Sequence, residues 1–338
     1  MRVALLTPLS RKASGFYNLV VDVASAAAQQ LEIDLDVIEA TADPKVMLER
    51  GKELVDRDRA TRPDYVVMSN HMGVASELLP LFSKASLGTL FVSEGFGVSD
   101  RLALGPQGCS AYLGEIVPDD VEAGRLLSEV LVSEARRRGM AGADGKIRMG
   151  ILCGMQTQVN SRRFRGWKTF KEGAEDVVQS GFRYAGRDEG GADAAALLLK
   201  TSPDTSLLWC FNDAIALGAV SYASSMGRKP GVDLLVGGFD LLERALAAIS
   251  EGTMFASIGG HIVDGARALL LLDDHHAKRD LHPRTWTSRL EVVTAAHAER
   301  YSAFMQDPSS FGADFTRFSA RRRGGAPEEL TLRALVTG

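Results

Sequence analysis

Short runs of β-branched and apolar residues alternate with longer amphipathic stretches along most of this chain, and this alternation limits its possible folds more than any other feature. The first apolar run covers residues 3–7, a helical pattern covers 16–31, and a second apolar run covers 33–38. A strand, a helix and a strand in this order predict a parallel strand pair joined by a crossover helix. Because the pattern recurs, we expect parallel sheets with helices on both faces.

Two series of this kind follow one another. The first continues with a helix, a strand, a helix and a strand over residues 44–59, 65–68, 74–84 and 89–92. The second alternates helices and strands over residues 119–138, 147–152, 163–178, 206–210, 214–225 and 232–236. A length of 338 residues exceeds what one hydrophobic core usually holds. The sequence therefore predicts two α/β lobes.

Composition and charge narrow the class of protein. The chain is 45% hydrophobic and 24% charged, which is typical of globular proteins with a substantial core. No stretch reaches the roughly 18 apolar residues that a membrane helix needs. The net charge of −4 disfavours a nucleic-acid partner, since proteins that bind nucleic acids usually carry a strongly basic face. For the same reason we interpret the basic run at residues 321–323 as a solvated surface patch.

The signatures of common enzymes are absent from the sequence. The turn after the first strand, residues 8–15, lacks the GxGxxG of dinucleotide-binding proteins, and residues 95–100 lack the third glycine. The chain has no GxxxxGK[ST] phosphate loop, no GxSxG nucleophile turn and no HExxH metal helix. We therefore expect no catalytic residues, no cofactor and no enzymatic activity.

Disulfide and metal chemistry receive no support either. Cys109, Cys153 and Cys210 are far apart and odd in number, so we interpret them as buried thiols. Residues 273–276 read Asp-Asp-His-His, but adjacent residues on a helix point in different directions and rarely converge on one ion. We expect a solvated helix end there and no metal site.

Four segments carry a resemblance to a known family. They are residues 160–167 (NSRRFRGW), 211–219 (FNDAIALGA), 236–240 (VGGFD) and 255–261 (FASIGGH). The second is a close copy of an Asn-Asp-x-x-Ala-x-Gly-Ala signature, and the first matches an Arg-x-x-Gly-aromatic element in which Arg163 is the arginine. Together the segments resemble the sugar-binding periplasmic proteins of the type 1 class, whose fold is shared by the effector domains of LacI-type repressors.

The resemblance implies a periplasmic binding protein-like α/β fold of two Rossmann-like lobes, each a parallel sheet flanked by helices. It assigns residues 1–115 and 260–289 to the N-terminal lobe and residues 116–259 and 290–338 to the C-terminal lobe. Crossovers near Ile116, Gly259 and Leu290 would form a hinge, about which the lobes close on a solute. The tail beyond Tyr301 is similar to extensions in a subgroup that includes furanosyl-borate autoinducer receptors.

Polar residues of the second lobe fall just after predicted strands. Ligands of open parallel sheets bind beyond the carboxyl ends of the strands, so Arg163, Asn212 and Asp240 should converge on one ligand. A guanidinium, an amide and a carboxylate can each bind two neighbouring sugar hydroxyls. Phe16 and Phe164 lie at strand-to-helix turns, from which they could stack on the apolar face of a sugar.

These assignments have structural alternatives. We assign Asp213 to the N-cap of the following helix, with direct ligand contact as the alternative, and Asp240 could equally cap the helix after its strand. Arg163 could pair with a surface carboxylate. Trp167, a further candidate ligand residue, occupies a helix position that suits either the core or a pocket.

Candidates in the first lobe rest on position rather than on motif. They are Ser10, Phe16 and Tyr17 after the first strand, Asn70 and His71 after the third, and Glu94 after the fourth. His261 lies at a predicted crossover, where the family more commonly has glutamine or asparagine. This histidine could be a ligand residue or a satisfied structural residue.

By resemblance, the chain is a substrate-binding protein that captures a small polar solute, a sugar, between its lobes. It would deliver this solute to the membrane permease of an ABC importer and work in the periplasm after removal of a leader. The alternatives are a sugar or autoinducer-type receptor that feeds a signalling partner, and the effector-binding part of a LacI-type regulator. A regulator should carry a helix-turn-helix before the first strand, so that alternative requires the chain to be a fragment.

Overall fold

The structure is a computed structural model that describes residues 1–97, 109–155, 157–186, 190–281, 285–308, 311–323 and 328–337. Part of the glycine-containing string at 95–100, residues 98–100, lies outside the described residues. The chain forms two compact units: unit 1 comprises Met1–Pro118, His261–Arg289 and Asp307–Gly338, and unit 2 comprises Asp119–Gly260 and Leu290–Gln306. Within the described ranges, no helix is long and apolar enough to cross a membrane.

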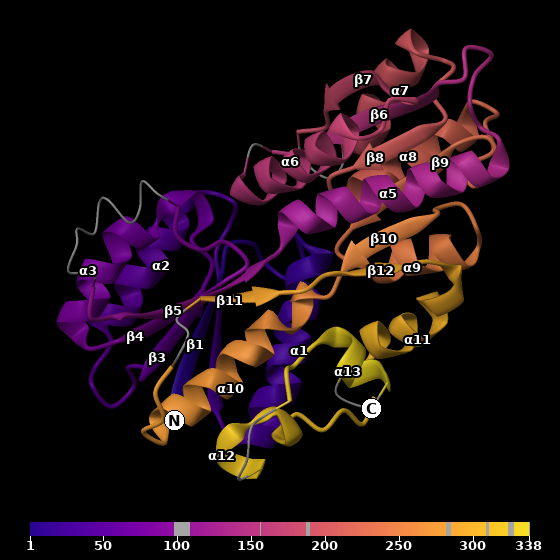
Figure 1. Ribbon diagram of the computed structural model, residues 1–338. Helices are drawn as coiled ribbons and strands as arrows, with labels where there is room; N and C mark the ends of the chain where they lie inside the picture. Colours follow the sequence, from indigo (N-terminus) through magenta and orange to yellow (C-terminus); the bar gives the residue numbers. More distant parts are fainter. Residues whose placement is uncertain are drawn as a thin grey trace. The chain divides into compact units, whose positions relative to one another are not determined.

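Unit 1 is built on a parallel sheet (Figure 1). Its strands are β1 (Arg2–Thr7), β2 (Asp34–Glu39), β3 (Tyr65–Met68), β4 (Gly88–Val92), β5 (Tyr112–Pro118) and β11 (Thr285–Ser288), in the spatial order β11-β5-β4-β3-β1-β2. All neighbouring strands pair in parallel. All strands therefore end at one edge of the sheet, which we call the carboxyl edge, and begin at the opposite amino edge.

Helices cover both faces of this sheet, as the sequence pattern predicts. Helices α1 (Gly15–Leu31) and α10 (Asp264–His276) pack together on one face, and α2 (Pro44–Asp56) and α3 (Ala75–Ala85) pack together on the other (Figure 1). The short helix η1 (His71–Gly73) follows β3, and the short helix η3 (His261–Val263) precedes α10. Leu6, Met68 and Phe91 are fully buried in one core cluster with residues of α2 and α3. The near-continuous apolar runs of the strands thus bury side chains on both faces.

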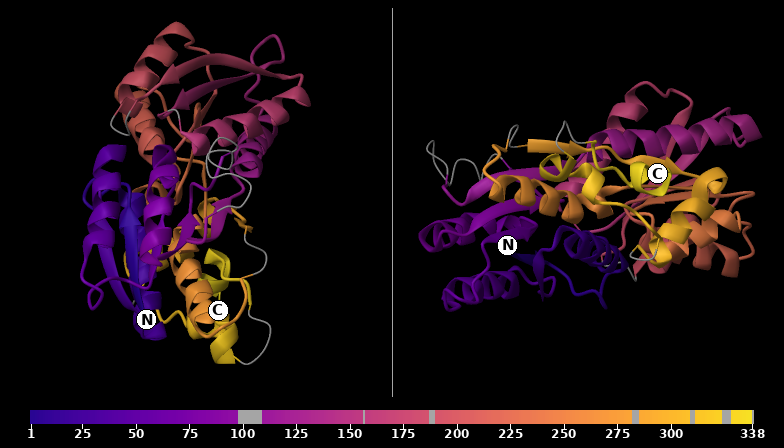
Figure 2. Two further views of the ribbon diagram at one scale, coloured as in Figure 1. Left: turned by 90° about the vertical axis from the view of Figure 1, so that its left-hand side faces the viewer. Right: turned by 90° about the horizontal axis from the view of Figure 1, so that it is seen from below.

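The C-terminal segment belongs to unit 1. It contains η4 (Thr316–Phe318), α12 (Ala320–Arg323) and α13 (Leu332–Thr337), and Figure 2 shows this yellow segment alongside α10. The amide of Gln30 in α1 donates to Ala313 O at 2.7 Å and accepts the Phe315 N–H at 2.8 Å. The sequence-based division placed residues 290–338 in the C-terminal lobe, but of these only Leu290–Gln306 belong to unit 2.

Two charge runs that are distant in the sequence pair with one another. Asp273 and Asp274, at the end of α10, are both buried. Arg321 Nη1 donates to Asp273 Oδ1 at 2.6 Å, and Arg322 Nε lies 3.5 Å from Asp273 Oδ2. Asp274 accepts the backbone N–H groups of Ala320 and Arg321 at 3.1 and 2.7 Å. The expectation of a solvated helix end at 273–276 is therefore wrong for Asp273 and Asp274, whereas Arg321 and Arg322 are exposed, as expected of a solvated surface patch.

Unit 2 contains the second sheet. Its strands are β6 (Ile147–Cys153), β7 (Val177–Tyr184), β8 (Leu207–Cys210), β9 (Leu235–Phe239), β10 (Ala256–Gly259) and β12 (Glu291–Val293), in the spatial order β12-β10-β9-β8-β6-β7. Only β12 runs antiparallel to its neighbour among these strands. The thiols of Cys153 and Cys210 are buried in this unit, whereas Cys109 of unit 1 is half-buried.

Helices cover both faces of the second sheet as well. Helices α5 (Asp120–Arg138) and α6 (Gln158–Glu172) pack together, as do α7 (Gly191–Thr201) with α8 (Asp213–Ser225) and α9 (Glu243–Ser250) with α11 (Ala295–Gln306). One predicted element is wrong at its end, because the helix expected over 163–178 stops at Glu172. Gly173 follows it, and Val177 and Val178 already begin strand β7.

Two glycines allow α5 and α6 to approach closely. A Cβ atom at Gly124 would lie 2.0 Å from the carbonyl oxygen of Arg163. A Cβ atom at Gly166 would lie 1.9 Å from the carbonyl oxygen of Val121. Only glycine leaves room for this backbone contact, which sets Arg163 against the first turns of α5.

Candidate functional site

Three of the predicted site residues meet at the carboxyl edge of unit 1. Asn70 and His71 follow β3, and Glu94 follows the neighbouring strand β4. Asn70 Nδ2 donates to Gly95 O at 3.1 Å, and its Oδ1 accepts the N–H of Ala75 at 3.0 Å, at the start of α3. His71 Nδ1 lies 3.5 Å from Glu94 Oε2. Position after a strand therefore does bring these buried polar side chains together.

The charge on His71 is controlled by Glu94. Burial lowers the pKa of His71, but the hydrogen bond and the negative charge of Glu94, together with the hydrogen bond to Ala42 O, outweigh this effect, so the pKa lies above its usual value. The other ring nitrogen, Nε2, lies 3.2 Å from Ala42 O. A protonated imidazole donates from both nitrogens, which matches the two oxygen neighbours.

An aromatic group forms a second part of unit 1. Phe16 and Tyr17 lie in the first turn of α1, and their ring centroids are 5.2 Å apart. The ring of Phe16 also lies 4.5 Å from the imidazole of His261 on η3, with 30° between the planes. Ser10, in the loop after β1, accepts the N–H of Ala13 with its hydroxyl oxygen at 3.3 Å. The fold thus brings His261 against Phe16, from which it is distant in the sequence.

In unit 2 the central residue is Arg163, which is only 3% exposed. Its Nε donates to Asp120 Oδ1 at 3.1 Å, its Nη1 donates to Phe211 O at 2.8 Å, and its Nη2 lies 3.4 Å from Asp240 Oδ1. The guanidinium lies 4.4 Å from the ring centroid of Phe239. Helix α6 begins at Gln158, so Arg163 lies in the second turn rather than at the opening of the helix. Its partners are the buried Asp120, a backbone carbonyl and the partly buried Asp240, and not a surface carboxylate.

Asp120 opens α5 and was not among the residues singled out from the sequence. Burial raises the pKa of Asp120 to about 6, against the opposing effect of Arg163. Its second oxygen, Oδ2, is buried and has no hydrogen-bond partner among the described residues. Because the same guanidinium also contacts Asp240, one cation serves two carboxylates, and its charge compensates each only in part.

The segment after β8 separates the roles of two adjacent side chains. Asn212, not Asp213, is the N-cap of α8: its Oδ1 accepts the N–H of Ile215 at 2.9 Å. The assignment of the cap to Asp213 is therefore wrong. Asp213 is fully buried, accepts the Ser257 hydroxyl at 2.8 Å, and accepts the N–H of Leu242 at 2.9 Å. Burial raises the pKa of Asp213 well above its usual value.

Backbone strain gathers at the same edges of the two sheets. Glu32, Ser86 and Lys278 have positive φ at or just after helix C-termini, where this conformation is common. Four other non-glycine residues with positive φ follow strands: Met72 and Ser93 in unit 1, and Asp240 (φ 105°) and Leu241 (φ 57°) in unit 2. Such conformations cost about 1–3 kcal/mol each and concentrate at functional sites. The carboxyl edges are therefore the candidate site in each unit.

The remaining aromatic candidates of unit 2 belong to its core. Trp167 is 5% exposed, and its Nε1 donates to Met149 Sδ at 3.2 Å. Phe164 stacks on Trp167 with ring centroids 5.2 Å apart, and it packs against the same hydrophobic cluster. Trp167 thus takes the core alternative that its helix position allowed, and its indole N–H is already satisfied.

Metal ligation finds no support in the arrangement of side chains. Within the part of the chain that the structure describes, no group of three or more histidine, cysteine or acidic side chains could hold a metal ion.

Two residues of the candidate site, Asp120 and Ser257, were not predicted from the sequence. Asp120 lies two residues after β5, so the rule that polar site residues follow strands would have found it, had residues 112–118 been recognised as a strand.

Comparison with known proteins places the chain in a family. The model of the periplasmic binding protein domain matches residues 104–272, which is half of the chain. The chain therefore belongs to the periplasmic binding protein family. A periplasmic sugar-binding protein from Pseudomonas fluorescens, known from its crystal structure, is 28% identical and has a TM-score of 0.84 over 95% of this chain and 94% of its own. The expected fold of two parallel-sheet lobes of the type I class is thereby confirmed.

Other relatives are similar over a smaller part or in fold alone. The D-ribose/D-allose-binding protein of Pseudomonas aeruginosa is 28% identical over 141 residues, which are 41% of each chain. The HTH-type transcriptional regulator IpsA of Corynebacterium glutamicum is 29% identical over 143 residues, 39% of this chain and 40% of that protein. The chain thus matches about two fifths of the length of these curated relatives. The binding component of the arabinose ABC transporter from Shewanella sp. ANA-3 shares the fold, with a TM-score of 0.76 and 18% identity over 92% of this chain and 97% of its own.

Proposed function

We propose that this protein is a substrate-binding protein that captures a small polar solute, a sugar, and delivers it to an ABC importer. The observation that carries the proposal is the placement of the candidate residues. Each unit gathers polar or aromatic side chains at the carboxyl edge of a parallel sheet, where ligands of such sheets bind. Membership of the periplasmic binding protein family and the 28% identity to a sugar-binding protein support this reading.

Asp240 is the side chain of unit 2 that we assign to the solute hydroxyls. The side chain of Asp240 remains 15% exposed, whereas the side chain of Arg163 is 4% exposed. Arg163 therefore acts as a positioning residue, which fixes the Asp240 carboxylate, and the exposed part of that side chain is accessible to a ligand. The strained backbone at Asp240 fits this role, because strain is retained where geometry serves a function.

Unit 1 contributes a polar and an aromatic element. The Glu94 carboxylate suits hydroxyl groups, and the pKa of the neighbouring His71 is raised, which favours a positive charge at the same edge. The buried Asn70 amide is bonded to Gly95 O and to the N–H of Ala75, so it acts as a positioning residue for this edge. The ring of Phe16, half-buried at the start of α1, suits the apolar face of a sugar. Selectivity follows from burial, since a solute that lacks one hydroxyl leaves a polar group unpaired at a cost of about 1–3 kcal/mol.

Thermal unfolding against pentoses, hexoses, polyols, nucleosides and furanoses tests the proposal. A solute that binds only the folded state should add about 2.7 kcal/mol at a hundredfold excess over Kd, which corresponds to a shift of several degrees. The shift should disappear in Asp240→Asn and persist in the control Glu172→Gln, an exposed acidic residue of α6. A panel without any shift would exclude the sugar assignment.

We further propose a periplasmic location and an ABC permease as partner, both supported by the family. The liganded protein should then stimulate the ATPase activity of the importer encoded beside it, in proteoliposomes, and the ligand-free protein should do so less. A purified importer that does not respond to the liganded protein would contradict delivery while leaving solute binding intact.

A second candidate function is ligand sensing in a regulator, favoured by the similarity to the regulator IpsA over 143 residues. In that case the same solute would bind, but it would alter the affinity of a larger polypeptide for DNA rather than the activity of an importer. The two candidates therefore differ in the partner that responds to ligand and not in the ligand site. We assign no catalytic activity to either, and turnover assays on the bound solute should show the solute unchanged.

A further inference from the structure

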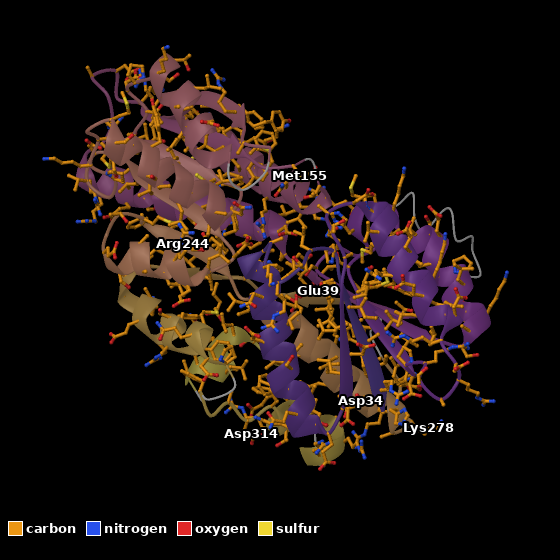
Figure 3. All side chains as sticks on the ribbon, turned by 180° about the vertical axis from the view of Figure 1, so that it is seen from behind. Asp34, Glu39, Met155, Arg244, Lys278 and Asp314 are labelled. Atoms are coloured by element: carbon orange, nitrogen blue, oxygen red, sulfur yellow. The ribbon has the colours of Figure 1, made fainter. Side chains whose placement is uncertain are left out.

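A cavity opens at the amino edge of unit 1, at the opposite end of the strands from the candidate site. It has a volume of about 870 Å³ and is lined by the starts of β3, β4 and β5, the loop before β3, and the ends of α3 and α10. Figure 3 shows Lys278 near the end of the unit at which Asp34 opens β2, whereas Glu39 marks the far end of that strand. The cavity belongs entirely to unit 1.

The lining of this amino-edge cavity is predominantly basic. Arg59, Arg62, Lys84 and Lys278 contribute four positive charges, and Asp64 contributes one negative charge. Arg59, Lys84 and Lys278 form no ion pair within the described residues. Elsewhere arginines such as those at 125, 136 and 148 pair with carboxylates at 3.1 Å or less.

The remaining neighbours do not neutralise these charges. The guanidinium of Arg62 donates to the carbonyl oxygen of Arg57 at 2.9 and 3.2 Å, which uses donors but adds no negative charge. The C-terminal ends of α3 and α10 each contribute a partial negative charge of about −0.5. Against four cations, one carboxylate and two helix ends leave an excess of about two positive charges in the cavity. A chain whose net charge is −4 thus concentrates positive charge here.

Neutral donors accompany the cations. Tyr65 places its hydroxyl 3.3 Å from His276 Nδ1, and its ring meets those of His275 and His276 edge to face. The hydroxyl groups of Ser86 and Ser110 also line the cavity. Phosphate oxygens accept hydrogen bonds from several donors at once and carry up to two negative charges per group, which matches this combination.

We propose that the amino-edge cavity binds a phosphate-bearing anion, with Arg59, Lys84 and Lys278 as its charged contacts and Tyr65 as a hydroxyl donor. The volume exceeds the needs of one phosphate group and suits a di- or oligophosphate. This site is independent of the solute proposed for the carboxyl edges, because no candidate ligand residue lines it. It gives unit 1 a second ligand, recognised by charge rather than by a pattern of hydroxyls.

The test measures binding of inorganic pyrophosphate to the full chain by isothermal titration calorimetry at two salt concentrations. The double variant Lys84→Gln/Lys278→Gln should weaken binding at least tenfold. The matched control Lys52→Gln/Lys200→Gln removes the same charge from exposed lysines on α2 and α7 and should bind like the wild type. Unchanged unfolding temperatures of both variants would show that the fold is retained.

A sedimentation arm with phosphatidylglycerol vesicles distinguishes a lipid headgroup from a free anion. Binding of pyrophosphate without vesicle binding assigns a soluble phosphate compound, and vesicle binding lost in Lys84→Gln/Lys278→Gln assigns a headgroup. Either result supports the site. Equal weakening in the pocket and control variants, or no binding of either probe by the wild type, would overturn the proposal.

Discussion

Asp120 and Arg163 form a buried ion pair that links the first turn of α5 to the second turn of α6. The guanidinium also holds Asp240 at the carboxyl edge of the sheet. The pair thus connects the packing of two helices with the position of a candidate ligand residue. Changes in either helix should therefore appear at the solute site.

Removal of the cation should destabilise the fold strongly. In Arg163→Met two carboxylates lose their buried partner, and such losses typically cost about 3–5 kcal/mol. Arg163→Lys keeps the charge but not the planar three-way contact, so it should cost less than Arg163→Met. Urea unfolding at pH 7 measures both. Equal stability of Arg163→Met and wild type would show that the buried cluster needs no compensating charge.

The Asp120 carboxyl group should make stability depend on pH. Its pKa is raised from 3.8 to about 6 in the folded state, so between these values the native protein binds more protons than the unfolded chain. Stability from this group is complete below pH 4 and is lost as the pH rises through about 6. Asp120→Asn should flatten the pH dependence of the unfolding free energy in this window. A pH dependence of the unfolding free energy that is unchanged in Asp120→Asn would contradict the assignment. The buried Asp213, whose pKa is also raised, should contribute to the pH dependence that remains.

The pKa of His71 should fall when its partner Glu94 loses its negative charge. In the wild type the pKa of His71 is raised by Glu94, so the charged pair stabilises the fold below about pH 6.5 and is lost as the pH rises through the folded-state pKa. In Glu94→Gln only burial remains as a strong effect, and the pKa should fall below that of the wild type. NMR titration of the imidazole resonances measures the shift, with the exposed Glu77→Gln as control. A pKa that is the same in both variants would rule out control by Glu94.

The glycine at the α5–α6 contact should not tolerate a side chain. Gly124→Ala places a methyl group 2.0 Å from the Arg163 carbonyl, so the helices must separate. We expect the free energy of unfolding to fall by an amount at or above the upper end of the ~1–3 kcal/mol typical of overpacking. Solute binding should weaken as well. Gly173→Ala is the control, because its Cβ would meet no atom closer than 3.9 Å. Denaturant unfolding should separate the two variants clearly.

Asp274 should be required for order in the C-terminal segment. Asp274→Ala removes the acceptor of two backbone N–H groups and of the Ser319 hydroxyl, at a cost of about 1–3 kcal/mol. Amide hydrogen exchange over residues 314–323 should accelerate in this variant. The exposed Asp280→Ala should exchange like the wild type. Unaltered exchange in Asp274→Ala would mean that apolar contacts alone hold the segment.

The fold could be predicted from the sequence because most of its strands bury both faces. Such strands read as apolar runs, as residues 3–7 and 65–68 do. Strand β7 was missed for a physical reason: it lies at the edge of the second sheet, and most of its residues, from Val178 to Tyr184, are only partly buried or exposed. Its sequence therefore lacks the apolar run, and Val177 and Val178 were read as the end of a helix.

Only those residues of the candidate site that closely follow a strand could be predicted from the sequence. Asn70, His71 and Glu94 were found in this way because neighbouring parallel strands end at one edge. Which side chain of a pair points inward could not be predicted: Asn212 caps α8, whereas Asp213, expected at the cap, is buried against Ser257. The burial of Arg163 depends on where α6 begins and on the glycines at 124 and 166, which act together only in the folded unit.

The path of the C-terminal segment bears on the use of this protein as a fluorescent biosensor. The last segment returns from α11 to unit 1, so the amino- and carboxyl-terminal segments both belong to that unit. A donor and an acceptor fluorophore fused to the two termini would therefore both be attached to unit 1 and report little of a motion of unit 2. An informative sensor needs one fluorophore inserted in unit 2, and the exposed turn at Gly145 between α5 and β6 is a suitable position.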